Sequence, residues 1–168
     1  MGKYLINVSF DHTKSYTSDG IVTFHFSGVI HIQGKESSVF IFELHKSNNC
    51  FRIRFQMKPD GESPFEDVNG NTSVRFKTIP NPLNNGLRSR KVHQDITLLH
   101  LDQLHILKKF QRKQCGTKLL ALIFIWAKYT FSDVKKCIVV SPSSIGKPFY
   151  QALGATQQIS SSNLMFLL

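Results

Sequence analysis

The chain has 168 residues, of which 41% are hydrophobic and 19% are charged, so we expect one folded domain rather than a disordered chain. Its 21 Lys and Arg against 11 Asp and Glu give a net charge of +10, which attracts anions such as nucleotides, acidic substrates or nucleic acid. No apolar segment is long enough to span a bilayer and the first residues lack an apolar signal core, which favours a cytoplasmic protein. The three cysteines, Cys50, Cys115 and Cys137, show no metal-ligand spacing, so no metal site is expected.

The first half of the chain is predicted to be made of strands. Its segments are rich in Val, Ile and Phe, and several alternate apolar with polar residues. Turn residues at 18–20, 34–36 and 47–49 separate them, and the last of these turns joins a hairpin. The predicted strands are 3–10, 21–33, 37–46, 50–59 and 72–79.

Two segments of the first half are predicted to be loops. Residues 60–71 are polar and rich in turn formers, with a short helix over 63–68 as an alternative. Residues 80–93 are basic and predict a mobile loop over a binding cleft. Helical periodicity is absent before residue 100.

The second half alternates strands with helices, which predicts a mixed α/β fold. The expected elements are a strand over 95–107, a helix from 116 to about 131, a buried strand over 136–142, a short helix over 144–153 and a final strand over 162–168. The longer helix is apolar nearly all round, so we expect it to be buried between layers, with Phe124 and Trp126 in the core.

The junction between the strand at 95–107 and the helix at 116 predicts an anion site. The first backbone N–H groups of a helix lack intrahelical partners, and the helix dipole points its positive end at the same place. The connecting loop adds four cations, Lys108, Lys109, Arg112 and Lys113, which suit a polyphosphate.

Two sequence blocks in this half, QRKQCG at 111–116 and SxxGxxFYxxLG at 143–154, resemble motifs of the GNAT superfamily of acetyl-CoA-dependent N-acetyltransferases. Residues 111–116, Gln-Arg-Lys-Gln-Cys-Gly, fill the family's pyrophosphate-loop frame Q/R-x-x-G-x-G/A, with Gln114 at its first Gly and Gly116 at its second. About thirty residues later, SxxGxxFYxxLG at 143–154 is similar to the family's NxxAxxFYxxxGF block. The resemblance covers residues 95–168 and says little about the rest.

The resemblance implies a fold with a central, mostly antiparallel sheet and a site for acetyl-CoA. In the family, backbone groups of the strand before the loop hold the pantetheine arm, and the loop and helix start hold the pyrophosphate. The corresponding cofactor-binding residues are Leu104, His105, Ile106, Gln111, Arg112, Lys113, Gln114, Cys115, Gly116 and Thr117, with Ser143 in place of an Asn that often contacts the arm.

The same resemblance suggests three catalytic residues. His100 and Asp102 lie on the strand where some members carry a base, and alternation places both on one face together with Leu104, whereas His105 faces the other way. His100 would accept the amine proton, and Asp102 would raise its basicity. Tyr150 aligns with the family's frequent general acid. The alternatives without a catalytic role are that His100 and Asp102 are polar residues on an exposed strand face and that Tyr150 is a core tyrosine.

The first half departs from the family pattern. GNAT folds normally place two helices between their first and second strands, and the sequence predicts none here. We therefore interpret 1–168 as one domain, with a divergent β-rich part at 1–95 that is a possible acceptor platform and an acetyl-CoA-binding core at 96–168. Gln114 in place of Gly is expected to weaken CoA binding unless its φ is negative.

The predicted function is direct transfer of an acetyl group from acetyl-CoA to a primary amine of a small molecule, a peptide or an aminoacyl-tRNA. The positive charge argues mildly against polyamine acceptors. A catalytically degenerate binding module and a basic nucleic-acid-binding protein remain alternatives, the second because Phe and Arg alternate in CFRIRFQMK and SVRFKT. A homodimer is possible.

Overall fold

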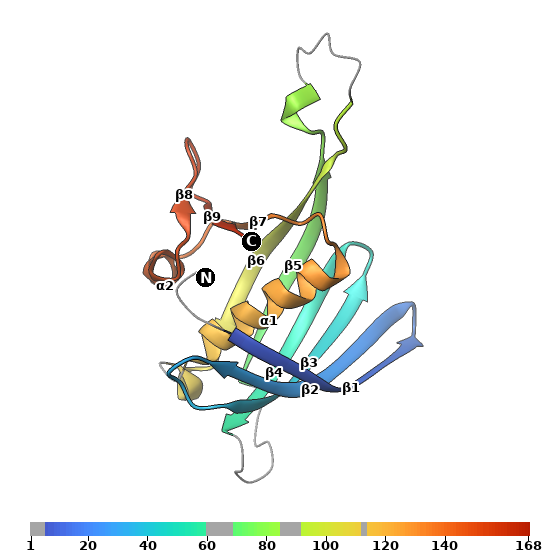
Figure 1. Ribbon diagram of the computed structural model, residues 1–168, viewed down its shortest axis with the longest axis vertical. Coiled ribbons are helices and arrows are strands. Elements are labelled where there is room, and N and C mark those ends of the chain that lie inside the picture. The colour runs from blue at the N-terminus through green and yellow to red at the C-terminus, as the bar shows by residue number, and fades with distance from the viewer. Residues whose placement is uncertain (1–5, 60–68, 85–91, 112–113) are drawn as a thin grey trace.

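The computed structural model describes residues 6–59, 69–84, 92–111 and 114–168. Its strands form one nine-stranded sheet in the order β1-β2-β3-β4-β5-β6-β7-β9-β8, and all neighbours are antiparallel except β6 and β7 (Figure 1). The strands are β1 (Ile6–Ser18), β2 (Ile21–Ile32), β3 (Ser38–Ser47), β4 (Cys50–Pro59), β5 (Gly70–Ile79), β6 (Ile96–Ile106), β7 (Lys136–Val139), β8 (Thr156–Gln157) and β9 (Leu164–Leu167). The helices are α1 (Cys115–Thr130) and α2 (Gly146–Ala152), with short 3-10 helices η1 (Pro82–Asn84) and η2 (Lys108–Phe110).

A tight hairpin joins β1 to β2, where two helices would stand in the expected family pattern. Asp19 and Gly20 form the turn with φ values of 51° and 74°. Two consecutive positive φ angles match the turn that follows the twist of paired strands, and Asp-Gly is a favoured sequence for it. The prediction that no helices stand between the first two strands is therefore confirmed.

The core lies between α1 and one face of the sheet. Alternation along β3 and β4 turns Phe40, Phe42, Ile53 and Phe55 inward, each at most 1% exposed. Trp126 of α1 packs on one aromatic ring of each of these strands and on Phe76 of β5. The helix crosses the sheet on this side (Figure 1), so the prediction of a buried, apolar helix is confirmed.

The outer faces of β4 and β5 are exposed and basic. Arg52 and Arg54 alternate with the buried residues of β4, and Arg75 and Lys77 point the same way on β5. The described part of the chain thus presents one packed face and one exposed face over these two strands.

Several predicted boundaries shift. β1 continues eight residues beyond the predicted end at Phe10, β7 ends at Val139 rather than at 142, and α2 is shorter than 144–153. β8 was not expected. The alternative helix over 63–68 and half of the predicted loop at 80–93 lie outside the described residues, and η1 stands in the described part of that loop. Neither described helix has the length and apolar character needed to cross a membrane.

Candidate active site

A cavity of about 190 Å³ opens where β6 and β7 part. Their parallel pairing runs from Leu99 to Leu101, and the Val140 N–H donates the last bond to the Leu101 carbonyl at 3.0 Å. β6 then continues to Ile106 beyond the end of β7. The residues lining the cavity are Leu101, Asp102, Gln103, Leu104, Val139, Val140, Ser141, Pro142, Ser143, Gly146 and Tyr150.

A β-bulge at Asp102 changes which face of the sheet each residue of β6 occupies. Leu101 pairs with Val74 and Gln103 with Ser73, which leaves Asp102 as the extra residue. Simple alternation over this strand is therefore wrong for residues after the bulge.

Two expected orientations on β6 are corrected by this register. Leu104 lies opposite the buried Thr72, so it shares the core side with Leu101 rather than with His100. His105 lies opposite the exposed Asn71, on the face that Arg75 and its partner His100 occupy, and it is exposed. The prediction that His105 faces away from His100 is thus wrong.

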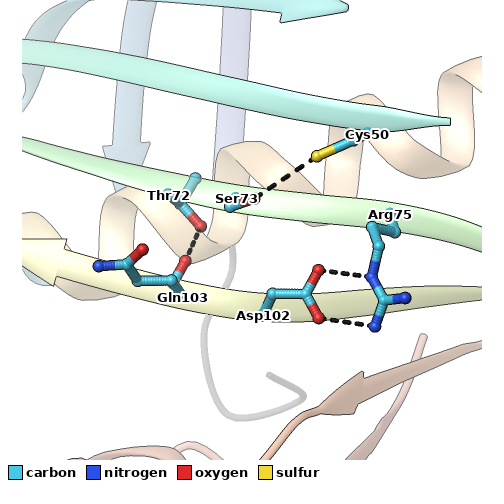
Figure 2. Close-up of polar contacts among 6 residues, drawn as sticks. All are labelled: Cys50, Thr72, Ser73, Arg75, Asp102 and Gln103. Carbon is cyan, nitrogen blue, oxygen red and sulfur yellow. Dashed lines mark hydrogen bonds and ion pairs between the residues drawn. The ribbon is translucent and has the colours of Figure 1, made fainter. Parts of the chain in front are cut away.

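Asp102 forms a two-pronged ion pair with Arg75 of the neighbouring strand. Arg75 Nε donates to Asp102 Oδ2 at 2.6 Å and its second nitrogen donates to Oδ1 at 2.9 Å (Figure 2). Two parallel bonds of this kind fix the carboxylate in one orientation. The pair stands at the cavity, because Asp102 is one of the lining residues.

His100 carries two enclosed ring nitrogens, and neither has a hydrogen-bond partner among the described residues. Burial lowers the pKa of His100 below its usual 6.5, and the cations of Arg75 and Lys77 lower this pKa further. Asp102 acts in the opposite direction but does not outweigh them, so the expected gain in basicity is not found. His100 is therefore a neutral imidazole at pH 7, able to accept a proton.

Tyr150 reaches the cavity from α2. Its side chain is 6% exposed and packs between Phe149 and Phe166, and burial raises the pKa of its phenol to about 12. None of the described residues hydrogen-bonds its hydroxyl. The phenol thus stays protonated at neutral pH and keeps a free donor at the cavity, unlike a core tyrosine with a satisfied hydroxyl.

The start of α1 presents backbone donors that make no bond within the helix. Its first intrahelical bond runs from the Lys118 N–H to the Gln114 carbonyl, so the N–H groups of Gly116 and Thr117 have no partner within the helix. Gln114 precedes them with φ 64° and no side-chain cap. This left-handed conformation is the one that a Gly adopts most readily, so the position behaves as a glycine position occupied by Gln.

The loop before α1 is tied back to β6. The Gln111 side chain donates to the Ile106 carbonyl at 3.0 Å, and the Leu107 N–H donates to the Asn69 carbonyl at 2.9 Å. Arg112 and Lys113 lie outside the described residues. The remaining loop cations, Lys108 and Lys109, are exposed in η2.

Two further expected site residues are engaged in local structure. The Ser143 hydroxyl lines the cavity and accepts a bond from the Gly146 N–H at 3.0 Å, so its own proton stays available to donate. Cys115 is buried at 3% exposure, with the Asn69 side-chain amide 4.0 Å from its sulfur. A buried thiol in this position fits structural packing rather than nucleophilic attack.

Sequence reasoning missed several residues that shape this region. Asn69 is buried and also accepts a bond from the Met57 N–H at 2.7 Å, so it joins the ends of β4 and β6 to the start of α1. Ser141 has φ 44°, and its N–H donates to Asn163. A cluster of turn-forming residues at 141–144 is the sequence signal that could have indicated this bend.

The chain matches no protein-family model and no curated protein. Its fold is similar to that of several solved structures. A KacTA–DNA complex superposes with a TM-score of 0.52 at 17% identity, over 73% of this chain and 70% of that chain. AtaTR bound with AcCoA gives 0.51 at 16% identity, over 71% and 70%. A tyrosine-to-phenylalanine mutant of KacT gives 0.50 at 17% identity, over 71% of each chain. These likenesses confirm the expected mixed α/β, GNAT-like fold with a mostly antiparallel sheet.

Proposed function

We propose that the chain is an N-acetyltransferase that moves an acetyl group from acetyl-CoA directly to a primary amine. The observation that carries the proposal is that the Tyr150 phenol and the Asp102 carboxylate line one cavity. Asp102 forms its ion pair with Arg75, the cross-strand neighbour of neutral His100. The fold likeness to AtaTR, which was solved with AcCoA bound, supports it.

Acetyl-CoA fits the residues present. The backbone N–H groups of Gly116 and Thr117 at the start of α1 would hold the pyrophosphate, and the backbone of β6 from Asp102 to Ile106, free of β7, would hold the pantetheine arm. When bound, acetyl-CoA supplies an activated acetyl thioester. Leu104, His105 and Ile106 would contribute backbone rather than side-chain contacts.

The protein's own groups would then manage the protons. The amine nitrogen must lose a proton as its bond to the acetyl carbon forms, and neutral His100 can accept that proton. Because both His100 nitrogens are enclosed, the proton reaches them through a water molecule or after a small side-chain movement. Tyr150 donates a hydrogen bond to the sulfur as the carbon–sulfur bond breaks, which stabilises the departing thiolate.

The Tyr150→Phe variant tests the proposal against a binding module that lacks chemistry. We expect this variant to bind acetyl-CoA as the wild type does, in a calorimetric titration at low and at moderate salt. Its turnover, followed as release of the free CoA thiol, should fall about 100-fold or more, the usual range for a lost acid–base group.

Three outcomes separate the candidates. Micromolar binding of acetyl-CoA that survives moderate salt, together with lost turnover in Tyr150→Phe, supports the enzyme. Binding without turnover in the wild type favours the binding module. Absence of acetyl-CoA binding contradicts the proposed function.

A further inference from the structure

Four exposed cations form a patch on the outer face of β4 and β5, which we call the basic strip: Arg52, Arg54, Arg75 and Lys77. Strand alternation creates it. On β4, Phe51, Ile53 and Phe55 point into the core, so the residues between them point outward. On β5, Val74 points into the core, so its neighbours in the sequence point outward as well.

The basic strip has a surplus of positive charge. Among the described residues only Arg75 of the four has an acidic partner, Asp102. Glu43 stands opposite Arg54 in the register of β3 and β4, but its carboxylate lies 2.7 Å from His45 Nε2. Arg52, Arg54 and Lys77 therefore have no acidic partner in the described part of the chain, and their exposed charges can meet an anion.

The basic strip adjoins the candidate active site. In the register of β5 and β6, Arg75 lies directly opposite His100. Arg52, Ser73 and Gln103 form one row across three strands, and Gln103 lines the cavity. Neighbouring strands are about 4.8 Å apart, so Arg52 lies about 10 Å from Gln103 along this row. An amine in the cavity could thus have an attached anionic group within reach of the strip.

The aromatic residues between these cations do not face outward. Phe51 and Phe55 are 6% and 0% exposed, and Phe76 packs on Trp126 and Phe131. The alternating Phe and Arg pattern therefore provides no platform on which bases could stack, which removes the feature that favoured a single-strand nucleic-acid surface. What remains on this face is charge, and guanidinium groups bind carboxylates and phosphates with paired hydrogen bonds.

We propose that the basic strip binds an anionic group of the acceptor, so that the acceptor is an amine that also carries a carboxylate or a phosphate. The acetylation of that amine rests on the proposed function. Binding of the anionic amine by the strip does not, and it can be measured separately.

The test compares three small amines on matched variants. The probes are ethanolamine, which has no anionic group, β-alanine, which has a carboxylate, and phosphoethanolamine, which has a phosphate. The strip variant is Arg52→Gln/Arg54→Gln. The control is Lys128→Gln/Lys135→Gln, which removes the same charge from exposed positions at the end of α1 and in the segment after it. A melting temperature equal to that of the wild type reports that each variant is folded, whether or not it binds acetyl-CoA.

We expect the wild type to prefer β-alanine or phosphoethanolamine over ethanolamine at least tenfold in kcat/KM, and the preferred probe identifies the anionic group. The strip variant should lower this preference about tenfold, mainly through KM, whereas the control should keep it. Equal use of the three amines, or a strip variant indistinguishable from the control, overturns the inference while acetyl-CoA turnover stands.

Calorimetric binding of phosphoethanolamine and β-alanine separates this inference from the proposed function. Binding that the strip variant loses, in a protein that does not bind acetyl-CoA, supports the strip and contradicts the acetyltransferase. A third outcome is that neither amine binds or reacts, but a double-stranded RNA binds with steep salt dependence. This outcome contradicts the proposal of a small anionic acceptor and shows that the strip contacts nucleic acid.

Discussion

Burial, together with the cations beside it, sets the chemical state of His100. The carboxylate is held by Arg75 and not by the imidazole, so His100 is surrounded by two cations, Arg75 and Lys77, and one paired anion. Burial and the two cations all favour the neutral ring. A histidine that is neutral at pH 7 can accept a proton without help from a carboxylate. This arrangement differs from the His–Asp pair that the sequence suggested.

Substitutions on either side of the ion pair should shift the pH profile in opposite directions. Because the pKa of His100 is lowered, the acid limb of kcat/KM should lie below pH 6.5 in the wild type. Arg75→Gln removes a cation and should move the limb to higher pH, whereas Asp102→Asn removes the anion and should move it to lower pH. Rates measured between pH 5 and 8 check this. A limb that stays in place in both variants would show that His100 is not the titrating base.

Gln114 is expected to tolerate Gly but not a β-branched residue. Its φ of 64° costs a non-glycine residue about 1 kcal/mol, and more for Val. Gln114→Gly should therefore keep or improve the affinity for acetyl-CoA, whereas Gln114→Val should weaken it and lower the melting temperature. Calorimetric titration and thermal unfolding of both variants provide the comparison. Equal behaviour of Gly and Val would contradict a required left-handed conformation.

At the scale of the element, the β1–β2 hairpin depends on a close backbone approach. A Cβ on Gly28 would lie 1.8 Å from the Ser9 carbonyl oxygen, next to the register shift between Phe10 and residue 12. The contact involves backbone on both strands, so no side chain can move aside to relieve it.

Gly28→Ala should therefore destabilise the fold by about 3 kcal/mol, the upper part of the range for overpacking. For a domain of this size each kcal/mol lowers the melting temperature by about 2–4 °C. The neighbouring Ser27→Ala is the control and should change stability by less than about 0.5 kcal/mol. A Gly28→Ala variant as stable as this control would contradict the described strand spacing.

Local patterns were sufficient for most elements of the fold but not for the contacts between them. Alternation predicted β3 and β4 because each has a strictly apolar side, whereas the second half of β1 is polar on both sides and gave no periodic signal. The motif at 111–116 predicted the start of α1 to within one residue. The bulge at Asp102 and the Arg75 ion pair could not be predicted, because both depend on the register between β5 and β6.

At the scale of the whole molecule, the dominant property is charge. A net charge of +10 is concentrated in part on the basic strip and makes the folded state repel itself. Only two ion pairs with described partners oppose this repulsion, and one of them depends on protonation of His45.

Salt should therefore stabilise the protein. Raising NaCl from about 10 mM to about 150 mM shortens the Debye length from about 30 to about 8 Å and screens the repulsion. We expect a gain of about 1 kcal/mol, seen as a rise of about 2–4 °C in the melting temperature. A melting temperature that falls with added NaCl would show that attractive pairs outweigh repulsion. Chloride is used because sulfate would itself compete for the cations.

The parallel pairing of β6 with β7 has a consequence for how the chain folds. Strands β1 to β4 pair with their sequence neighbours through short turns, so their contacts close small loops. Leu99 and Cys137 are separated in the sequence by the whole of α1. Pairing them therefore closes a longer loop, which costs more chain entropy. We therefore expect the hairpins to gain hydrogen-exchange protection early in refolding and β7 to gain it late, which makes the cavity between β6 and β7 one of the last parts of the molecule to form.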